Sequence, residues 1–338
     1  MGLSALGSAA SFANVPAAAG ERGYAQGPYG LVHFNDTRTG MGVPMVLLHQ
    51  APMSHRQFSA VYGLLSARGV RAIGIDTPGF GMSDPTPFVP QVSDWASSIV
   101  AVLDHLKISR ADMVGHHTGS LIATEVSLQF PKRVNKVVLN GPFPINESER
   151  KLFLDDLQKS EVDFEYRADG SHLSASFVKR SQFFGPGADP RHITRMQVEK
   201  FQGFGPFWYG HNAAYRYDHA SSLLRMTHPT LILTNTGDMA YPMAQRARQL
   251  RPDMAYVELS GGNVDIVDQA PQAWVEAVVA FTRRDGRQLG CRGRDPRYPV
   301  LLRAPRHSLR CAASTTGDEL RRRSSRTVRY RAKSRAPC

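Results

Sequence analysis

Hydrophobic positions alternate along the chain between short continuous runs and runs with helical spacing. Continuous apolar runs, typical of strands buried on both faces of a sheet, occur at 30–34, 43–49, 71–76, 112–114, 134–140, 229–234 and 255–259. Apolar residues recur every three or four positions, as on one face of a helix, at 55–68, 95–106, 120–126, 242–250 and 271–281. This alternation predicts an α/β fold with a mainly parallel, doubly wound sheet.

The alternation is interrupted between about residues 142 and 227. Charged helices are expected near 147–159, followed by a glycine-rich aromatic stretch at 183–217. We interpret this insertion as a helical lid over the carboxyl ends of the strands. Its aromatic residues either line an apolar pocket or form a small core of the lid itself, and for most of them we favour the second role. They are Phe201, Phe204, Phe207, Trp208, Tyr209 and Tyr215.

Composition separates the two ends of the chain from this core. Residues 1–23 are rich in Ala, Gly and Ser and read as a flexible leader, so the folded domain is expected at 24–283. Residues 283–338 contain seventeen Lys or Arg and four Asp or Glu, which gives this segment a charge of +13. The whole chain has a net charge of +12, so residues 1–282 together carry −1. The near-neutral core gives no reason to expect nucleic acid or a membrane as its partner. A small-molecule substrate is expected instead.

The basic tail at 284–338 has no sustained period, and disorder is expected. It either binds an acidic partner or is a read-through extension without function. All three cysteines lie in it, so we expect no disulfide in the core and a cytoplasmic location. No run of ~20 apolar residues, the length that spans a bilayer, occurs. The oligomeric state is not encoded in any pattern of this kind.

A sharp turn is predicted at residues 115–119 (GHHTG), between a buried strand and a helix. Glycines at its two ends allow the backbone to tighten, so that residue 117 projects above the sheet. His117 therefore lies at a helix N-terminus, where the helix dipole disfavours a protonated ring. A neutral imidazole in this place is able to take a proton from water.

Over residues 24–283 the chain resembles the α/β-hydrolase fold family, and several motifs in the family's order carry the resemblance. They are residues 49–52 (HQAP), 76–84 (DTPGFGMSD), 115–119 (GHHTG), 235–238 (NTGD) and 261–265 (GGNVD). The resemblance implies that these segments are the oxyanion loop, the glycine-rich loop after the next strand, the nucleophile elbow, the acid loop and the histidine loop.

The chain departs from the family's catalytic triad at two of three positions. The elbow carries His117 in place of a nucleophile, and the usual histidine position carries Val264. Only Asp238 matches its counterpart. Because a serine-type mechanism needs a nucleophile, a base and an orienting carboxylate together, we do not carry that chemistry over.

We expect His117 instead to reach across the position of Val264 to Asp238 and form a two-residue catalytic site. The backbone N–H groups of Gln50 and Thr118 would be the oxyanion donors, as the resemblance implies. The expected activity is cofactor-free hydrolysis of a small apolar ester, lactone or related carbonyl compound. A catalytically silent ligand-binding protein, or a cofactor-free lyase or oxygenase that uses the same base, remain alternatives.

Several other polar or aromatic residues are candidates for the site but also have simpler structural roles. His49, His211 and Trp208 are candidates for substrate contact, although a polar lid role for His211 and also for His219 is the simpler reading. His116 is expected to be structural, Asp218 to cap a helix, and Asp265 and Asp268 to lie at the surface or at caps. A metal site from His49, His117, Asp238 and His211 is conceivable, but no close ligand spacing supports it, and we expect neither metal nor cofactor.

Overall fold

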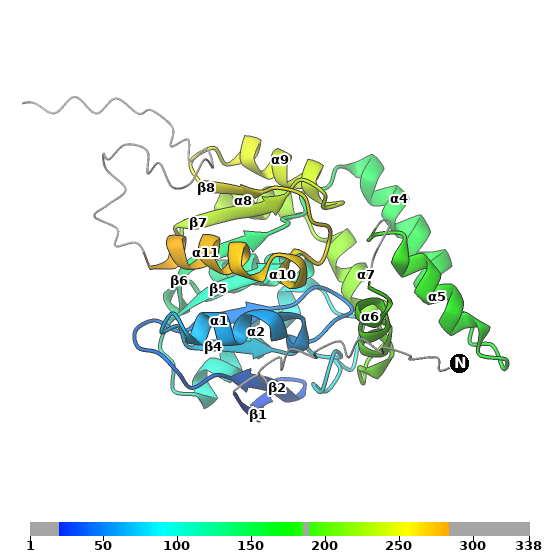
Figure 1. The fold of residues 1–338 in the computed structure, drawn as a ribbon, viewed down its shortest axis with the longest axis horizontal. Coiled ribbons are helices and arrows are strands. Elements are labelled where there is room, and N and C mark those ends of the chain that lie inside the picture. Colours follow the sequence, from blue (N-terminus) through cyan, green and yellow to red (C-terminus); the bar gives the residue numbers. More distant parts are fainter. Residues whose placement is uncertain (1–19, 185–188, 284–338) are drawn as a thin grey trace, which may run out of the picture. The chain divides into compact units, whose positions relative to one another are not determined.

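The computed structural model describes residues 20–184 and 189–283. Most of the leader, and the basic tail with its three cysteines, therefore lie outside the described residues. The described strands form one eight-stranded sheet in the order β1-β2-β4-β3-β5-β6-β7-β8 (Figure 1). The β1–β2 and β2–β4 pairs are antiparallel and the others are parallel, so the predicted mainly parallel sheet is confirmed. The strands are β1 (Glu21–Gly27), β2 (Gly30–Asp36), β3 (Met45–Leu48), β4 (Ala72–Ile75), β5 (Ala111–His116), β6 (Val134–Asn140), β7 (Thr230–Asn235) and β8 (Ala255–Leu259).

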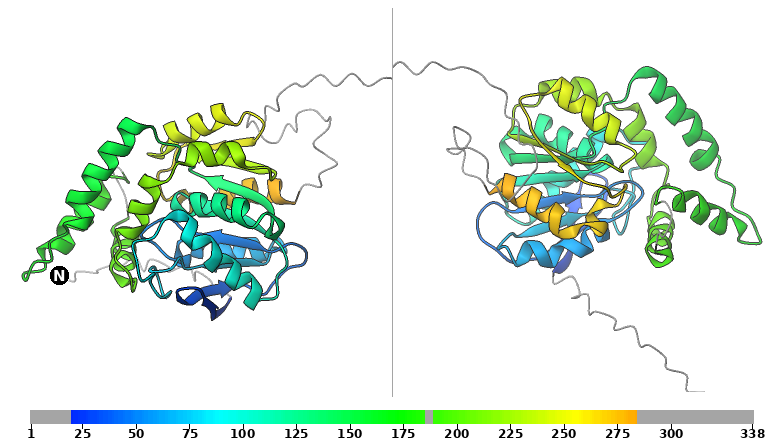
Figure 2. Two further views of the ribbon diagram at one scale, coloured as in Figure 1. Left: turned by 180° about the vertical axis from the view of Figure 1, so that it is seen from behind. Right: turned by 45° about the horizontal axis from the view of Figure 1, so that its top comes forward.

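Helices cover both faces of the sheet, as Figures 1 and 2 show from opposite sides. One apolar core includes Trp95 and residues of α2 and α3, and the other includes Trp274 and residues of α1 and α11. Both indoles are completely buried, which anchors each helical layer on the sheet. The helices are η1 (His55–Phe58), α1 (Ser59–Ser66), α2 (Val92–His105), α3 (Thr118–Gln129), η2 (Pro131–Arg133), α4 (Glu147–Leu157), η3 (Gln158–Val162), α5 (Ser171–Ser181), α6 (Pro190–Gln202), α7 (Tyr209–Arg216), α8 (His219–Arg225), α9 (Tyr241–Leu250), α10 (Ile266–Gln269) and α11 (Pro271–Thr282).

The first strand is the main element that the hydrophobic pattern missed. β1 begins at Glu21, so the last three residues assigned to the leader belong to the sheet. It pairs with β2 from Glu21 opposite Asp36 to Gly27 opposite Gly30. β1 is an edge strand with mostly exposed side chains, and backbone hydrogen bonds rather than an apolar face hold it in place. A strand of this kind leaves little hydrophobic signal in the sequence.

The insertion between β6 and β7 contains the helices α4 to α8. Figures 1 and 2 show α6 and α7 next to the sheet and α4 and α5 farther from it. Three phenylalanines of the insertion pack together around the ammonium group of Lys200, which lies 4.3 Å from the ring centre of Phe207. The other two rings are those of Phe164 and Phe201. For Phe201 and Phe207 the expected role in a small core of the insertion is therefore confirmed.

No helix within the described ranges is both long and apolar enough to cross a bilayer.

Candidate active site

His117 occupies a tight bend between β5 and α3. Its backbone has φ 47° and ψ −112°, a conformation that residues other than glycine seldom adopt. A Cβ atom on Gly115 would collide with the carbonyl of Gly119, and one on Gly119 would collide with the carbonyl of Leu48. The His117 N–H donates to the Asn140 carbonyl of β6 at 2.8 Å. Close packing on both sides thus fixes the direction in which the imidazole leaves the backbone.

The imidazole meets the carboxylate of Asp238, as expected from the sequence. His117 Nε2 lies 2.8 Å from Asp238 Oδ2. Asp238 follows β7, and its other oxygen accepts the Ala240 N–H at 2.9 Å. Val264, at the usual histidine position of the resemblance, is buried and offers no polar atom. His117 and Asp238 therefore contact each other directly, without the histidine that the resemblance implies at position 264.

The electrostatic environment settles which imidazole nitrogen is free. Burial would raise the pKa of the Asp238 carboxyl, but His117 and the Ala240 N–H outweigh it and hold that pKa below its ordinary value. An ionised carboxylate only accepts hydrogen bonds, so Nε2 of a neutral His117 carries the proton and Nδ1 keeps its lone pair. The ring remains 16% exposed, and no described residue hydrogen-bonds to Nδ1. Nδ1 is therefore the basic atom of this pair.

The Gln50 N–H, expected to be an oxyanion donor, is already used. It donates to the side-chain oxygen of Gln57 at 2.9 Å in a buried setting. The amide nitrogen of Gln57 then faces Nδ1 of His116. His116 is completely buried, as its expected structural role requires, and burial next to His117 lowers its pKa well below the ordinary value. The prediction for Gln50 is thus wrong for the arrangement seen here, because Gln57 satisfies its N–H.

His49 is likewise occupied by structural contacts. Its Nδ1 lies 2.9 Å from the Gln50 carbonyl, and its Nε2 accepts the Thr77 N–H at 3.0 Å. The Thr77 N–H requires a lone pair on Nε2, so Nδ1 carries the proton, and burial lowers the pKa of the ring. With both nitrogens used, His49 joins two loops and is not available to a substrate. The expected contact of His49 with a substrate is therefore replaced by a structural role.

The two insertion residues singled out from the sequence contact other parts of the insertion. His211 Nδ1 lies 2.8 Å from Glu161 Oε1, and its ring stacks on Tyr215. Trp208 packs edge-on against Tyr209 with ring centres 4.7 Å apart. None of these contacts involves His117 or Asp238. A role for either residue in substrate binding stays a prediction.

His219 and Asp218 both have structural hydrogen-bond partners. Nδ1 of His219 accepts the Phe143 N–H and its Nε2 lies 3.1 Å from the Thr124 hydroxyl, while burial lowers the pKa of the ring to about 3. Asp218 caps α8 through the Ser221 N–H, so its expected capping role is confirmed.

A buried ion pair near the site was missed by the sequence reasoning. The carboxylate of Asp265 accepts the Gln50 side-chain amide at 2.8 Å and one guanidinium nitrogen of Arg180, on α5, at 3.0 and 3.1 Å. Burial raises the pKa of Asp265 against the opposing effect of Arg180. Asp265 thus neither caps α10 through its side chain nor lies at the surface. Only the fold brings these three segments together.

Two further contacts join α6 to the core. Arg195 donates to Asp268 at 2.7 Å, and Glu199 accepts the Ser54 hydroxyl at 2.9 Å. The expected surface or capping role of Asp268 is therefore also corrected to an ion pair with the insertion. No spacing in the sequence links positions this far apart.

A model of the α/β hydrolase fold family matches residues 43–263, which is more than half of the chain. The chain belongs to the α/β hydrolase fold family. The matched region contains the elbow and Asp238 and ends next to Val264, so the resemblance found in the motifs is confirmed at the level of the family.

Several relatives of this chain are named as hydrolases. The chain is 38% identical over 114 residues to a 2-hydroxy-6-oxononadienedioate/2-hydroxy-6-oxononatrienedioate hydrolase of Burkholderia vietnamiensis, a match to 32% of this chain and 39% of that protein. An (E)-2-((N-methylformamido)methylene)succinate hydrolase of Acinetobacter baylyi is 25% identical over 70% of this chain and 92% of that protein. The expected class, a hydrolase, agrees with these names.

Solved structures of the same hydrolase fold are similar to this chain. An E-2-(acetamidomethylene)succinate hydrolase superposes with a TM-score of 0.64 at 18% identity, covering 78% of this chain and 100% of that one. An esterase from Exiguobacterium antarcticum gives a TM-score of 0.65 at 19% identity, covering 77% and 99%. At this identity the likeness concerns the fold.

Two groups of side chains within the described residues have ligand atoms close enough to hold a metal ion. One is His116, His117 and Asp238. Because the Gln57 oxygen accepts the Gln50 N–H, its amide nitrogen must donate to Nδ1 of His116, which leaves the proton on Nε2. In this tautomer the lone pair of His116 lies on Nδ1 and accepts the Gln57 amide, while the protonated Nε2 has no hydrogen-bond partner among the described residues, so the group fits a proton-transfer site better than a metal centre.

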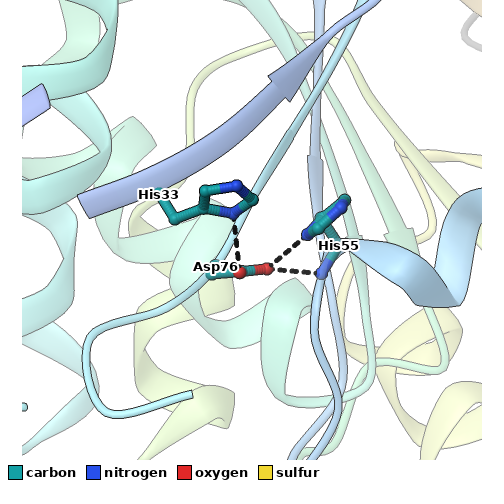
Figure 3. Close-up of side chains that lie close together, drawn as sticks. All are labelled: His33, His55 and Asp76. Atoms are coloured by element: carbon teal, nitrogen blue, oxygen red, sulfur yellow. Dashed lines mark hydrogen bonds and ion pairs between the residues drawn. The ribbon is translucent and has the colours of Figure 1, made fainter. Parts of the chain in front are cut away.

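The second group is His33, His55 and Asp76 (Figure 3). Nδ1 of each histidine lies 2.9 Å from a different oxygen of Asp76. The backbone N–H groups of His55 and Met82 donate to the same two oxygens. Four donors therefore satisfy the buried carboxylate, which joins β2, η1 and the loop after β4. Burial raises the pKa of Asp76, but the two histidines outweigh it and lower that pKa far below its ordinary range.

We predict that Asp76→Asn lowers the free energy of unfolding at pH 7 by about 3 kcal/mol or more. The NH2 group of the asparagine would face the N–H donors that now bind a carboxylate oxygen, so buried donors would lose their acceptor. A carboxyl group with a lowered folded-state pKa stabilises above its unfolded pKa of about 4 and loses this contribution as the pH falls. Urea unfolding between pH 7 and pH 3 should show a shallower acid loss in the variant than in the wild type. Equal slopes would contradict this account of Asp76.

We predict that Arg180→Met destabilises the protein by about 3 kcal/mol, because it leaves the buried Asp265 carboxylate without its cation. Arg191→Met is the matched control, since Arg191 pairs with Asp189 at the exposed surface of the same insertion. Urea unfolding at pH 7 should show a change of at most about 0.5 kcal/mol for the control. Similar effects of the two variants would show that the ion pair with Asp265 is not special.

Proposed function

We propose that this protein is a cofactor-independent hydrolase of small esters, lactones or related carbonyl compounds, with His117 as its general base. The observation that carries the proposal is the 2.8 Å contact between His117 Nε2 and Asp238 Oδ2 at the elbow. It lies within the hydrogen-bond reach of ~2.6 to 3.2 Å that an oriented base requires. Asp238 holds the tautomer in which Nδ1 is free to accept a proton.

The mechanism follows from this tautomer. A water molecule next to Nδ1 gives its proton to His117 as its oxygen attacks the substrate carbonyl. Asp238 stabilises the imidazolium that forms, because an ionised carboxylate is its nearest partner. The imidazolium then protonates the leaving oxygen, which returns the base to its neutral form. No acyl-enzyme on a serine is involved, since residue 117 has no hydroxyl group.

The negative charge on the former carbonyl oxygen is stabilised at the start of α3. The Thr118 N–H is the first of this helix and has no acceptor within the helix. The helix dipole adds to its effect on an anion. Gln50, whose N–H is held by Gln57, supports the loop instead of binding the oxyanion.

The names of the relatives add a further group of candidate substrates. The names of the Burkholderia and Acinetobacter relatives describe hydrolases of a dienedioate or trienedioate and of a substituted succinate. These substrates are carbonyl compounds with carboxylate groups. We extend the proposed class to such acids and interpret the β6–β7 insertion, which contacts the core next to the site through Arg180, as the lid over the substrate.

We predict that His117→Ala and Asp238→Asn each lower kcat by at least about 100-fold, the usual contribution of a positioned base. A panel of p-nitrophenyl esters, lactones and carboxylated vinylogous ketones identifies the substrate on which the rates are measured. His228→Ala, which alters a histidine whose ring hydrogen-bonds to the Pro131 carbonyl, is the control and should keep wild-type turnover.

Wild-type turnover in His117→Ala would refute this function. Thermal stabilisation by a panel compound without any turnover would instead identify a silent ligand-binding protein. Conversion without incorporation of an oxygen atom from water would identify a cofactor-free lyase or oxygenase.

A further inference from the structure

We propose that Gly141 is a positioning residue of the His117–Asp238 pair, because the absence of its side chain creates the space through which the imidazole reaches the carboxylate. This inference rests on the proposed function for its catalytic consequence. Its geometric part is independent of the reaction. Gly141 follows β6 directly, and no motif in the sequence marks it as part of the site.

The space beside Gly141 is defined by three contacts. A Cβ atom placed on Gly141 would lie 2.5 Å from Cδ2 and 2.8 Å from Nε2 of His117. It would lie 3.3 Å from Oδ2 of Asp238. The first two distances are shorter than van der Waals contact allows. The hydrogen bond between His117 and Asp238 therefore lies next to the position that a Cβ atom of residue 141 would occupy.

The backbone on either side of this contact cannot yield easily. The Gly141 N–H donates to the Leu233 carbonyl of β7 at 2.9 Å, and Asn140 accepts the His117 N–H at 2.8 Å. The Asn140 side chain is fixed in turn by the Trp274 indole N–H at 2.7 Å. The elbow itself has no room at Gly115 or Gly119. A side chain at position 141 would therefore displace the imidazole ring rather than the chain.

Displacement of the ring has a specific chemical consequence. Rotation away from position 141 moves Nε2 away from Asp238, and the tautomer that leaves Nδ1 basic is then no longer held. Asp238 would remain in place, since the Ala240 N–H and its own loop position it. We expect the loss of orientation to affect proton transfer and to leave substrate binding largely unchanged.

The test compares Gly141→Ala with Gly170→Ala. Both glycines have left-handed backbone conformations, with φ 65° and 75°, so both variants carry similar backbone strain. A Cβ on Gly170 meets no atom within 4 Å. Gly141→Asn is a second variant for the case that the alanine variant folds poorly, since asparagine tolerates this conformation better and still carries a Cβ.

The first measurement is the imidazole nitrogen NMR spectrum of His117, assigned by comparison with His117→Ala. In the wild type and in Gly170→Ala, we expect Nε2 to be protonated and hydrogen-bonded and Nδ1 to be free. Gly141→Ala and Gly141→Asn should lose this hydrogen-bonded signal. Its retention in either folded variant would overturn the inference, whatever reaction the protein catalyses.

The second measurement is a double-mutant cycle on the substrate found with the panel. Gly141→Ala should lower kcat by about 100-fold with less than a threefold change in KM, as expected for the loss of an oriented base. In the Asp238→Asn background the same substitution should have an effect of less than threefold, because the contact it disturbs is already absent. A 100-fold loss in that background, or an equal loss in Gly170→Ala, would contradict the inference.

The two proposals fail in different ways. If His117→Ala keeps wild-type turnover while Gly141→Ala still loses the hydrogen-bonded Nε2 signal, the proposed function is wrong and the positioning role stands. If His117→Ala is inactive and Gly141→Ala is fully active, the proposed function stands and the role of Gly141 is wrong.

Discussion

The contact between His117 and Asp238 is the interaction on which the interpretation of this protein depends. It requires three constraints at once: an elbow that projects residue 117, a loop after β7 that fixes Asp238, and room for a ring between them. The elbow supplies direction through its two glycines, and the sheet supplies the distance through the neighbouring ends of β5, β6 and β7. An imidazole in this place brings its Nε2 within 2.8 Å of the Asp238 carboxylate.

The polar groups around this contact are connected rather than isolated. Asp265 binds the side chain of Gln50, whose backbone N–H is held by Gln57, which in turn faces His116 beneath the elbow. Arg180 joins this series to the β6–β7 insertion. Buried polar groups are costly unless they are satisfied, so such a series holds the loop after β3 in one conformation. The same contacts hold this loop in place although the Gln50 N–H donates to Gln57 and is not free to bind an oxyanion.

The carboxylate of Asp76 shows the same principle at the other side of the loop. Two imidazoles and two backbone N–H groups surround it, and these four donors stabilise a negative charge in the interior. Its position directly after β4 ties β2, at the antiparallel edge of the sheet, to η1. The site thus depends on groups that lie well outside it.

The sequence by itself determined the fold class, most strand positions and the elbow, because hydrophobic period and glycine spacing are local properties. The bounds of β6 and β8 agree with their apolar runs, and the meeting of His117 with Asp238 followed from the order of the motifs. Only the tertiary structure decided the partners of Gln50, His49 and Asp265, and the space at Gly141. These depend on which distant segments become neighbours in the fold, and no local pattern encodes a contact between residues so far apart in the chain.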